Sequence, residues 1–294
     1  MRELRALLKT MRPKQWVKNG FIFAALIFDK KMLNPTYTLR TLAGFLLFSL
    51  ISGTVYLIND LVDIEKDRQH PRKRHRPLPS GQLSQRTAIA AALLLVPIVV
   101  GLAFALDPAF GAILLGYLLL QIAYSFVLKE IVLLDVMAIA AGFVLRVAAG
   151  VPLVEAERFS PWLYICTTLL ALFLGLGKRR GELMLLAEGA GEHRKSLQKY
   201  TVQLLDQLIS VVTSATIIAY AFYTFSAPNL PPNDTMMLTI PFVLYGIFRY
   251  LYLVHAEHTT LAPDEVLLTD RPLQIDLILW GLTAVGILYL GGRG

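Results

Sequence analysis

The sequence predicts an all-α protein, a polytopic membrane helical bundle with about nine transmembrane helices. Two compositional observations lead to this prediction: 55% of the 294 residues are apolar while only 17% are charged, and the mean hydropathy is clearly positive. A third observation is that the apolar residues gather in runs approaching the length of a bilayer span, each bounded by Pro, Gly or charge. We therefore expect a single transmembrane domain over residues 1–294.

The apolar runs give the order of the expected helices. The first residues are basic, and we expect them to lie along the membrane surface, followed by a first span at about Trp16–Phe28. The other eight spans are expected near residues 40–60, 85–106, 109–128, 132–152, 161–177, 207–226, 237–254 and 273–291. The one cysteine, Cys166, lies in such a run, so no disulfide framework exists within one chain.

The distribution of Lys and Arg predicts the orientation. Most of these residues lie in the N-terminal segment, the loop at 64–86, the turn at 129–130 and the loop at 178–199. The opposite loops are short and poor in basic residues, although Lys30, Lys31 and Arg40 are exceptions. Because basic loops stay in the cytoplasm, we expect an integral protein of the plasma (inner) membrane, with a cytoplasmic N-terminus and its charged motifs on the cytoplasmic face.

A mixed acidic and basic stretch, residues 59–81, follows the second expected span. Its acidic part, N-D-L-V-D-I-E-K-D, would place four oxygen-bearing side chains within an arc of roughly 100° on a helix. They are Asn59, Asp60, Asp63 and Asp67. Carboxylates at this spacing repel one another, and a hard divalent cation such as Mg²⁺ would relieve the repulsion. The alternative is a solvated helix end of mixed charge.

Four basic residues come directly after the acidic ones. They are Arg72, Lys73, Arg74 and Arg76. Guanidinium and ammonium groups suit an anionic substrate. Acidic groups for a metal ion beside basic groups for phosphate predict a diphosphate site.

A second set of candidates lies at residues 124–135, Y-S-F-V-L-K-E-I-V-L-L-D, and at Arg146 in the span that follows. Lys129 and Glu130 could form a simple loop pair of little stabilising effect. Asp135 and Arg146 lie in or near an apolar run, where an unpaired charge is costly. Either they form structural ion pairs with other helices, or Asp135 orients metal or substrate and Arg146 holds a phosphate.

Two further groups of basic residues admit two interpretations each. The segment from Lys178 to Glu182 follows the sixth span and either anchors the helix at the headgroups or binds phosphate through Lys178 or Arg179. Near the N-terminus, Lys14 and Lys18 flank a tryptophan. They form either an interfacial belt or one wall of a substrate pocket.

These motifs resemble the UbiA-type membrane prenyltransferase superfamily. The resemblance is carried by N-D-x-x-D-x-x-x-D at the end of a span, followed by H-P-x-K-R-x-R-P-L-P-S-G. The chain departs from the usual pattern at the second acidic motif, where D-x-x-x-D is expected and only Asp135 is present. The form Y-S-x-x-L-K-x-x-x-x-x-D at 124–135 is instead similar to the decaprenyl-phosphate phosphoribosyltransferase branch. The same branch is matched by R-P-K-Q-W-V-K-N at 12–19, G-K-R-R-G-E at 177–182, Y-G-I-F-R-Y at 245–250 and P-D-E-V-L-L-T-D-R-P-L at 263–273.

The resemblance implies a UbiA-like fold and a Mg²⁺-dependent enzyme. Such an enzyme would transfer 5-phosphoribose from phosphoribosyl pyrophosphate to a polyprenyl phosphate, releasing diphosphate, for the synthesis of an arabinose-donor lipid of the cell envelope. Its expected partners are these two substrates and the bilayer, with no nucleic acid, and a homo-oligomer is left open. The implied metal ligands are Asn59, Asp63 and Asp67, and the implied catalytic residues are Asp60, Asp63, Asp67 and Asp135. The implied substrate-binding residues are Lys14, Lys18, Lys73, Arg76, Tyr124, Lys129, Arg146 and Lys178.

Two alternatives remain at this stage. A UbiA-type enzyme could instead move a prenyl group from prenyl diphosphate to an aromatic acceptor, with the same use of metal and diphosphate. A transporter is a different class of protein, but its charges would follow a route across the membrane. Here the charges are expected at one face, which disfavours a transporter.

Overall fold

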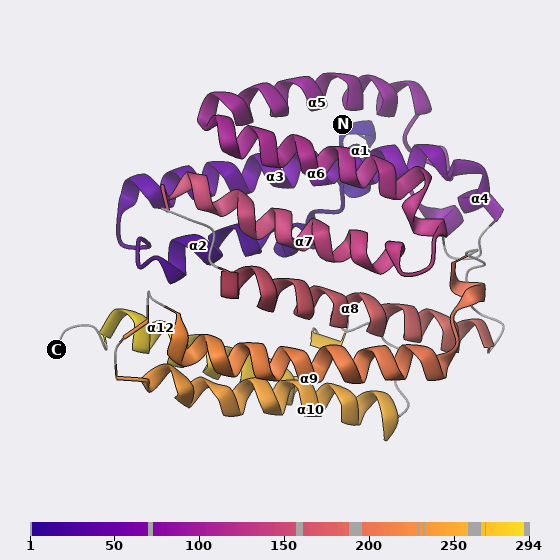
Figure 1. The fold of residues 1–294 in the computed structure, drawn as a ribbon. Helices are drawn as coiled ribbons and strands as arrows, with labels where there is room; N and C mark the ends of the chain where they lie inside the picture. Colours follow the sequence, from indigo (N-terminus) through magenta and orange to yellow (C-terminus); the bar gives the residue numbers. More distant parts are fainter. Residues whose placement is uncertain are drawn as a thin grey trace. The chain divides into compact units, whose positions relative to one another are not determined.

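The structure is a computed structural model, and it describes residues 2–69, 73–156, 161–187, 196–227, 230–231, 233–257, 266–267 and 269–290. Within these residues every regular element is a helix, and no β-strand occurs (Figure 1). The all-α prediction is therefore confirmed.

Eight helices are long and apolar enough to cross a membrane. Seven of them match the expected spans closely, and the eighth, α8, extends well beyond its expected end. The eight are α3 (Pro35–Val62), α5 (Gln85–Leu106), α6 (Pro108–Phe126), α7 (Leu134–Leu153), α8 (Pro161–Ala187), α9 (Val202–Ser226), α10 (Ile240–His255) and α12 (Arg271–Leu290). The polytopic membrane prediction is confirmed.

The first expected span takes a different form. It is a 3₁₀ helix of ten residues, η1 (Pro13–Ile22), followed by an α-helix of six residues, α2 (Phe23–Phe28). Because a 3₁₀ helix rises more per residue than an α-helix, these two elements together cover about 29 Å, close to the thickness of the hydrocarbon layer. The segment is thus helical without being one α-helix, and it is not among the eight helices that are long enough to cross a membrane.

Side-chain caps explain where several long helices begin. The Asn34 side chain accepts a hydrogen bond from the Thr36 amide at the start of α3, where Pro35 occupies the first turn. Ser84 caps α5 and Thr201 caps α9 in the same way. Such caps satisfy amides that have no partner within the helix.

The contacts of the chain group into two compact units. The first unit comprises Met1–Leu26, Lys31–Phe126 and Leu145–Arg158, and the second comprises Ile27–Lys30, Val127–Val144 and Phe159–Gly294. Helix α7 begins in the second unit and ends in the first. The expectation of a single domain stays a prediction.

In the first unit, α3 packs against η1, α5 and α6. Its apolar core includes Phe48, Phe110 and Leu114, none of which has exposed surface. The closest backbone approach is at Gly150 of α7, where a Cβ atom would lie 2.1 Å from the carbonyl oxygen of Ile22. Only glycine allows η1 to lie this close to α7.

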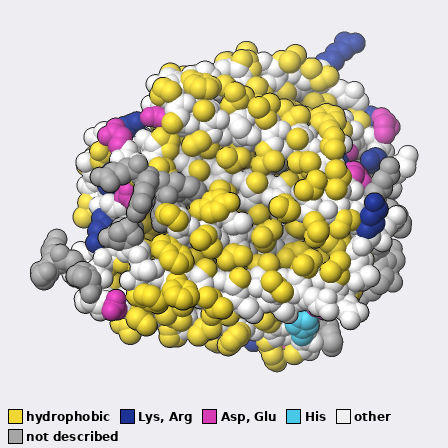
Figure 2. Space-filling model, viewed as in Figure 1, with side chains coloured by type: hydrophobic (Ala, Val, Ile, Leu, Met, Phe, Trp, Pro, Cys, Tyr) yellow, Lys and Arg dark blue, Asp and Glu magenta, His cyan; other side chains and the backbone are white. Residues whose placement is uncertain are grey.

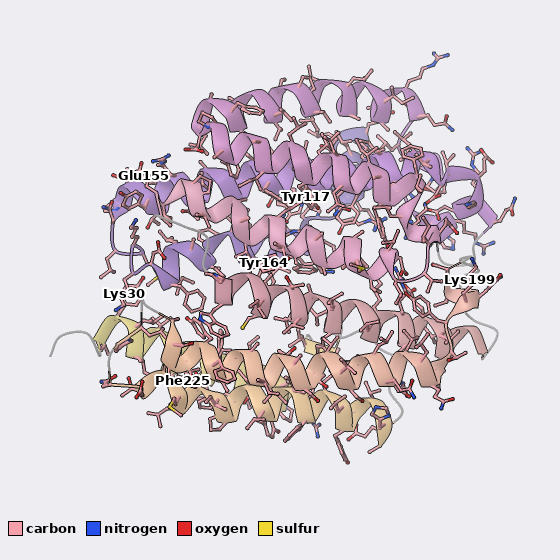
Figure 3. All side chains as sticks on the ribbon, viewed as in Figure 1. Lys30, Tyr117, Glu155, Tyr164, Lys199 and Phe225 are labelled. Carbon is pink, nitrogen blue, oxygen red and sulfur yellow. The ribbon has the colours of Figure 1, made fainter. Side chains whose placement is uncertain are left out.

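Charged residues at the start of α3 explain the exceptions to the expected charge distribution. Arg40 forms an ion pair with Glu155, the residue labelled in Figure 3, and lies 3.5 Å from Asp107. The ammonium group of Lys31 donates to the carbonyl oxygen of Val154 at 2.7 Å. Two of the three basic residues that departed from the expected charge distribution thus have partners, Arg40 acidic ones and Lys31 a backbone carbonyl.

In the second unit, α8 packs along α9, and α10 contacts α9 and α12. Its core includes Val136, Phe173, Leu205 and Tyr250. Many apolar side chains of both units are exposed, as Figure 2 shows on one face. Exposed apolar surface on this scale suits contact with lipid.

Candidate active site

The acidic residues of the first motif lie where α3 ends. The helix stops at Val62, Asp63 caps it, and the short helix α4 (Ile64–Gln69) follows, so the motif does not lie on one continuous helix as expected. Two backbone hydrogen bonds nevertheless keep the helical spacing, from the Asp63 amide to Asn59 (3.0 Å) and from the Asp67 amide to Asp63 (2.8 Å). The three expected metal ligands therefore remain one turn apart.

Asp67 is buried and lies between two basic side chains. The guanidinium of Arg76 donates to its Oδ2 at 2.7 Å, and the ammonium of Lys73 lies 3.9 Å from its Oδ1. Lys73 begins the short 3₁₀ helix η2 (Lys73–His75), and Arg76 follows it directly, with its amide bonded to the Lys73 carbonyl oxygen at 2.9 Å. The expected acidic and basic groups are thus brought together, while Arg72 lies outside the described residues.

Asp60 is also buried and pairs with a residue that sequence reasoning missed. Arg12 donates to its Oδ1 at 2.6 Å, and Arg76 lies 3.3 Å from the same oxygen. Arg12 has a left-handed backbone conformation, and its guanidinium lies over the ring of Tyr56. The only available signal was its place at the start of the motif R-P-K-Q-W-V-K-N, in which Lys14 and Lys18 were singled out instead.

The side-chain oxygen of Asn59 accepts a hydrogen bond from the hydroxyl of Ser125 in α6. This contact connects the end of α3 to the segment that carries Tyr124, an expected substrate-binding residue that is half-buried. Asp63 is also half-buried. Asn59, Asp63 and Asp67 therefore lie near one another, although Ser125 and Arg76 hold two of them.

The donor set fits a hard divalent cation, because amide and carboxylate oxygens are the ligands that Mg²⁺ prefers. The presence of Lys73 and Arg76 at Asp67 shows that the carboxylates draw positive charge to this point. In the described part of the chain, no group of three or more His, Cys, Asp or Glu side chains could hold a metal ion. Mg²⁺ commonly relies on one or two carboxylates together with substrate phosphates, which suits such a sparse set.

The expected N-terminal residues lie on η1. Lys14 is exposed and Lys18 is half-buried. Asn19, one residue further on, is buried and donates to the hydroxyls of Ser49 and Ser52 at 3.1 Å each.

Arg146 of α7 belongs to this polar network in the first unit. Its Nε donates to the Asn19 side-chain oxygen and one terminal nitrogen donates to the Tyr117 hydroxyl, both at 2.8 Å (Figure 3). The guanidinium also lies 4.8 Å from the centre of the Tyr117 ring. The side chain is 8% exposed, and these partners are neutral groups. The Asn19 and Tyr117 side chains thus fix the orientation of this buried guanidinium.

Asp135 and Arg179 form the corresponding buried group of the second unit. Arg179 donates from Nε to the Asp135 carboxylate at 2.6 Å and also pairs with Glu182. The Tyr200 hydroxyl donates to the other Asp135 oxygen at 2.8 Å and accepts the Leu133 amide at 2.8 Å. Burial raises the pKa of Tyr200 to about 12, and its bonds to Leu133 and Asp135 modify that shift. Asp135 thus has the ion-pair partner on another helix that the sequence left open.

The segment from Lys178 to Glu182 is helical, contrary to the expected loop at 178–199. Helix α8 continues to Ala187 because its arginines find acidic partners instead of leaving the helix. Arg179 is only 1% exposed, so it does not reach out to headgroups, and Arg180 pairs with Asp206 of α9 at 2.6 Å. Lys178 is exposed.

Two other expected features lie in the second unit. Lys129 is half-buried in the short 3₁₀ helix η3 (Leu128–Glu130), and its carbonyl oxygen accepts a hydrogen bond from Ser196. Asp270, just before α12, accepts hydrogen bonds from Arg249 and from the Leu273 amide. The bond from Arg249 holds the pKa of Asp270 below its usual value.

Comparison with known proteins assigns the chain to a family. The model of the UbiA prenyltransferase family matches residues 20–266. The chain belongs to this family. It is therefore an enzyme of an integral-membrane family, as the sequence predicted.

Two curated relatives match nearly the whole chain. A protein of Corynebacterium glutamicum is 32% identical, with 97% of this chain and 87% of that protein covered. A protein of Mycolicibacterium smegmatis is 31% identical, with 96% and 92% covered. Both are named decaprenyl-phosphate phosphoribosyltransferase, so the resemblance to that branch is confirmed.

Solved structures share the fold. A UbiA homolog from Archaeoglobus fulgidus bound to GPP and Mg²⁺ superposes with a TM-score of 0.72 at 17% identity, covering 96% of this chain and 99% of that one. A structure reported for digeranylgeranylglyceryl phosphate synthase superposes with a TM-score of 0.67 at 17% identity, covering 98% of this chain and 99% of that one. At this identity the likeness establishes the UbiA fold alone.

Proposed function

We propose that this enzyme transfers 5-phosphoribose from phosphoribosyl pyrophosphate to a polyprenyl phosphate and releases diphosphate. The observation that carries the proposal is the cluster of Asp67, Asp60, Lys73 and Arg76, in which carboxylates and cations lie within 4 Å of each other. Such a cluster suits a metal ion together with a diphosphate. The names of the relatives support phosphoribose as the group that is transferred.

The chemistry needs charge stabilisation more than it needs a strong base. The bond between C1 of the ribose and the diphosphate oxygen breaks, the electron pair leaves with diphosphate, and C1 gains oxocarbenium character. An oxygen of the lipid phosphate, already ionised at neutral pH, forms the new bond to C1. A bound Mg²⁺ would neutralise charge on the departing diphosphate.

We assign roles in the first unit as follows. Asn59, Asp63 and Asp67 would hold Mg²⁺, and Lys73 and Arg76 would bind diphosphate oxygens. Arg146 would bind a further phosphate, since it is a buried guanidinium that Asn19 and Tyr117 fix in orientation. The remaining substrate-binding candidates of this unit are Lys14, Lys18 and Tyr124.

In the second unit, we propose that Lys129 and Lys178 bind substrate phosphate. Asp135 has no exposed side-chain surface, and both its oxygens accept hydrogen bonds from neighbouring side chains. We therefore propose that it acts by fixing Arg179, as a positioning residue, and not by direct contact with substrate.

The setting of the reaction follows from the same reasoning. We propose that the enzyme lies in the plasma membrane with its charged cluster on the cytoplasmic side, because the basic loops resist translocation. The polyprenyl tail would remain among the apolar helices, and the product would be a precursor of an arabinose-donor lipid for the cell envelope. This would explain why the reaction is carried out by a membrane protein.

A second candidate is the transfer of a prenyl group from prenyl diphosphate to an aromatic acceptor. It is favoured by one observation, the shared fold with a UbiA homolog bound to GPP and Mg²⁺. In that reaction the lipid would be the electrophile, and no second phosphate of the donor would need a binding group.

Binding measurements separate the two candidates. Phosphoribosyl pyrophosphate carries a 5-phosphate besides its diphosphate, whereas prenyl diphosphate carries only the diphosphate. Removing a partner from a buried charge contact costs about 2–5 kcal/mol, so Arg146→Ala and Lys129→Ala should weaken binding of phosphoribosyl pyrophosphate by well over tenfold. Binding of plain diphosphate should change far less.

Titration calorimetry on the purified protein would measure both affinities. Equal loss for the two ligands would mean that Arg146 and Lys129 serve only the diphosphate. If the unmutated protein bound a prenyl diphosphate but not phosphoribosyl pyrophosphate, the second candidate would replace the first.

A further inference from the structure

The two buried carboxylates of the cluster differ in how their cations hold them. Both oxygens of Asp67 face cations from the segment that follows it, with Arg76 at 2.7 Å and Lys73 at 3.9 Å. Asp60 instead shares one oxygen between Arg76 at 3.3 Å and Arg12 at 2.6 Å. Arg76 therefore contacts both carboxylates, while Arg12 contacts only Asp60 among these two.

This difference decides what happens if Arg76 moves. Asp60 would keep its shorter contact, because Arg12 reaches it from the N-terminal segment and is held over the Tyr56 ring at 4.6 Å. Among the described residues, Asp67 would lose its close hydrogen bond to Arg76 and keep Lys73 at 3.9 Å. A buried carboxylate left without a close cation needs a new one. Movement of Arg76 thus makes Asp67 available to another cation and leaves Asp60 paired.

The two basic side chains that hold Asp67 are partly exposed, as is that of Arg12, whereas Asp67 itself is buried. The side chains of Arg76 and Lys73 are 31% and 22% exposed, whereas that of Asp67 is 5% exposed. A divalent ion bound to Asp67 would lie close to both cations and would repel them. Either cation, once displaced, loses a charge-assisted contact and requires an anion to replace it.

We propose that Arg76 and Lys73 are exchange residues, which neutralise Asp67 before substrate binds and move to the diphosphate when Asp67 takes up Mg²⁺. This inference rests on the proposed function, since it requires a metal and a diphosphate at the cluster. Asp60 stays with Arg12 throughout and acts as a positioning residue, not as a metal ligand. Metal and diphosphate then bind cooperatively, and each raises the affinity for the other by the same factor.

Metal binding in the absence of diphosphate should become tighter when either cation is removed. A cation beside a carboxylate repels a metal ion bound to that carboxylate, so removing the cation should tighten metal binding about tenfold or more. Arg76→Gln should therefore bind Mn²⁺, used as a probe for Mg²⁺, more tightly than the unmutated protein. Lys73→Gln should act in the same direction with a smaller effect, because Lys73 lies further from Asp67.

Electron paramagnetic resonance of free Mn²⁺ would measure these affinities in the full-length protein in detergent, with and without pyrophosphate. Pyrophosphate should tighten Mn²⁺ binding to the unmutated protein and do so much less for Arg76→Gln. The complex of Mn²⁺ with pyrophosphate in solution is the same for every variant, so differences between variants report the protein. Arg76→Lys keeps the charge and should behave like the unmutated protein.

Arg68→Gln is the matched control, since Arg68 lies on α4 but pairs with the exposed Glu65. It should leave Mn²⁺ binding unchanged. If Arg76→Gln and Lys73→Gln bind Mn²⁺ alone no more tightly than the unmutated protein does, the exchange is refuted while the proposed function stands. If no form binds Mn²⁺ even with pyrophosphate, the exchange and the metal part of the proposed function fail together.

Discussion

Each unit buries at least one aspartate that pairs with an arginine, but the two groups are built differently. In the first unit, Asp67 pairs with Arg76, whose side chain is 31% exposed. In the second unit, Asp135 pairs with Arg179, and both side chains are almost completely buried. Tyr200 adds a further hydrogen bond to Asp135.

The difference indicates that the first group can exchange its cations for a ligand, whereas the second group stabilises the fold. A pair whose cation is partly exposed can open at smaller cost when a ligand arrives. A fully buried pair with an added hydroxyl is costly to break, because either partner alone would be left as an uncompensated charge. We therefore expect substitutions in the first group to abolish activity with little loss of stability, and those in the second group to reduce stability first.

The largest expected effect is on turnover when Asp67 is changed. Loss of a metal ligand removes several kcal/mol of transition-state stabilisation, so Asp67→Asn should lower kcat about a thousandfold or more. The melting temperature in detergent should stay close to that of the unmutated protein, because Arg76 is partly exposed and keeps Asp60 as a partner when Asp67 is changed. Turnover assays with added Mg²⁺ and thermal unfolding would measure the two effects.

Glu65→Gln serves as the matched control for Asp67→Asn, because Glu65 is an exposed carboxylate on the same short helix. It should retain full turnover. A fully active Asp67→Asn would remove the basis for a metal site at this helix end.

The next effect is on stability when the buried pair of the second unit is broken. Removing one partner of a buried ion pair costs about 3–5 kcal/mol, so Asp135→Asn and Arg179→Met should each lower the unfolding free energy by an amount of this order. The double variant should lose less than the two single losses added together, since no charge is then left unpaired. Thermal and denaturant unfolding in detergent would measure these changes.

Arg68→Met is the control for Arg179→Met, because its ion pair is exposed and should contribute little. If Asp135→Asn melted like the control, the buried pair would not be the support that its geometry indicates.

The smallest effect concerns the hydroxyl of Tyr200. Tyr200→Phe removes the hydrogen bond to Asp135, which should cost about 1–3 kcal/mol because the carboxylate is buried. Burial raises the pKa of Tyr200 from 10.0 to about 12, so the folded protein binds this proton more tightly than the unfolded chain does. Its contribution to stability is therefore complete below pH 10 and declines as the pH rises from 10 towards 12.

Melting temperatures between pH 8 and about 11 would reveal this window, with a steeper decline for the unmutated protein than for Tyr200→Phe. Parallel declines in the two proteins would mean that Tyr200 is not the group responsible.

Most of the fold was accessible from the sequence because it depends on local pattern. Long apolar runs predict spanning helices wherever they occur, and eight of these helices are observed. The form of the segment before Lys31 was not accessible, since hydropathy does not distinguish the 3₁₀ helix η1 from an α-helix. The continuation of α8 past residue 177 was missed for another reason. Its charged residues suggested a loop, and only the acidic partners on other helices make a helix favourable there.

The candidate site also has a part that the local sequence predicts and a part that only the structure shows. Asn59, Asp63 and Asp67 could be grouped because helical spacing brings them together within one short stretch. Arg12 pairs with Asp60 from 48 residues away, and no local pattern predicts that contact. The sequence suggested that Arg179 is a headgroup anchor or a phosphate ligand. Its actual partner, Asp135, lies 44 residues earlier in the chain, too far away for a local pattern to predict the ion pair. Charge patterns in the sequence therefore identified the charged side chains, whereas their ion-pair partners could be known only from the structure.

The central claim, transfer of phosphoribose to a lipid phosphate, is tested most directly by identifying the product. The purified protein would be incubated with phosphoribosyl pyrophosphate, a short polyprenyl phosphate and Mg²⁺, and the lipids would be analysed by mass spectrometry. The account predicts a new lipid heavier than the acceptor by one phosphoribose unit, formed together with an equal amount of diphosphate and absent with Asp67→Asn. Unchanged polyprenyl phosphate, alongside prenylation of an aromatic acceptor when prenyl diphosphate is supplied instead, would contradict it.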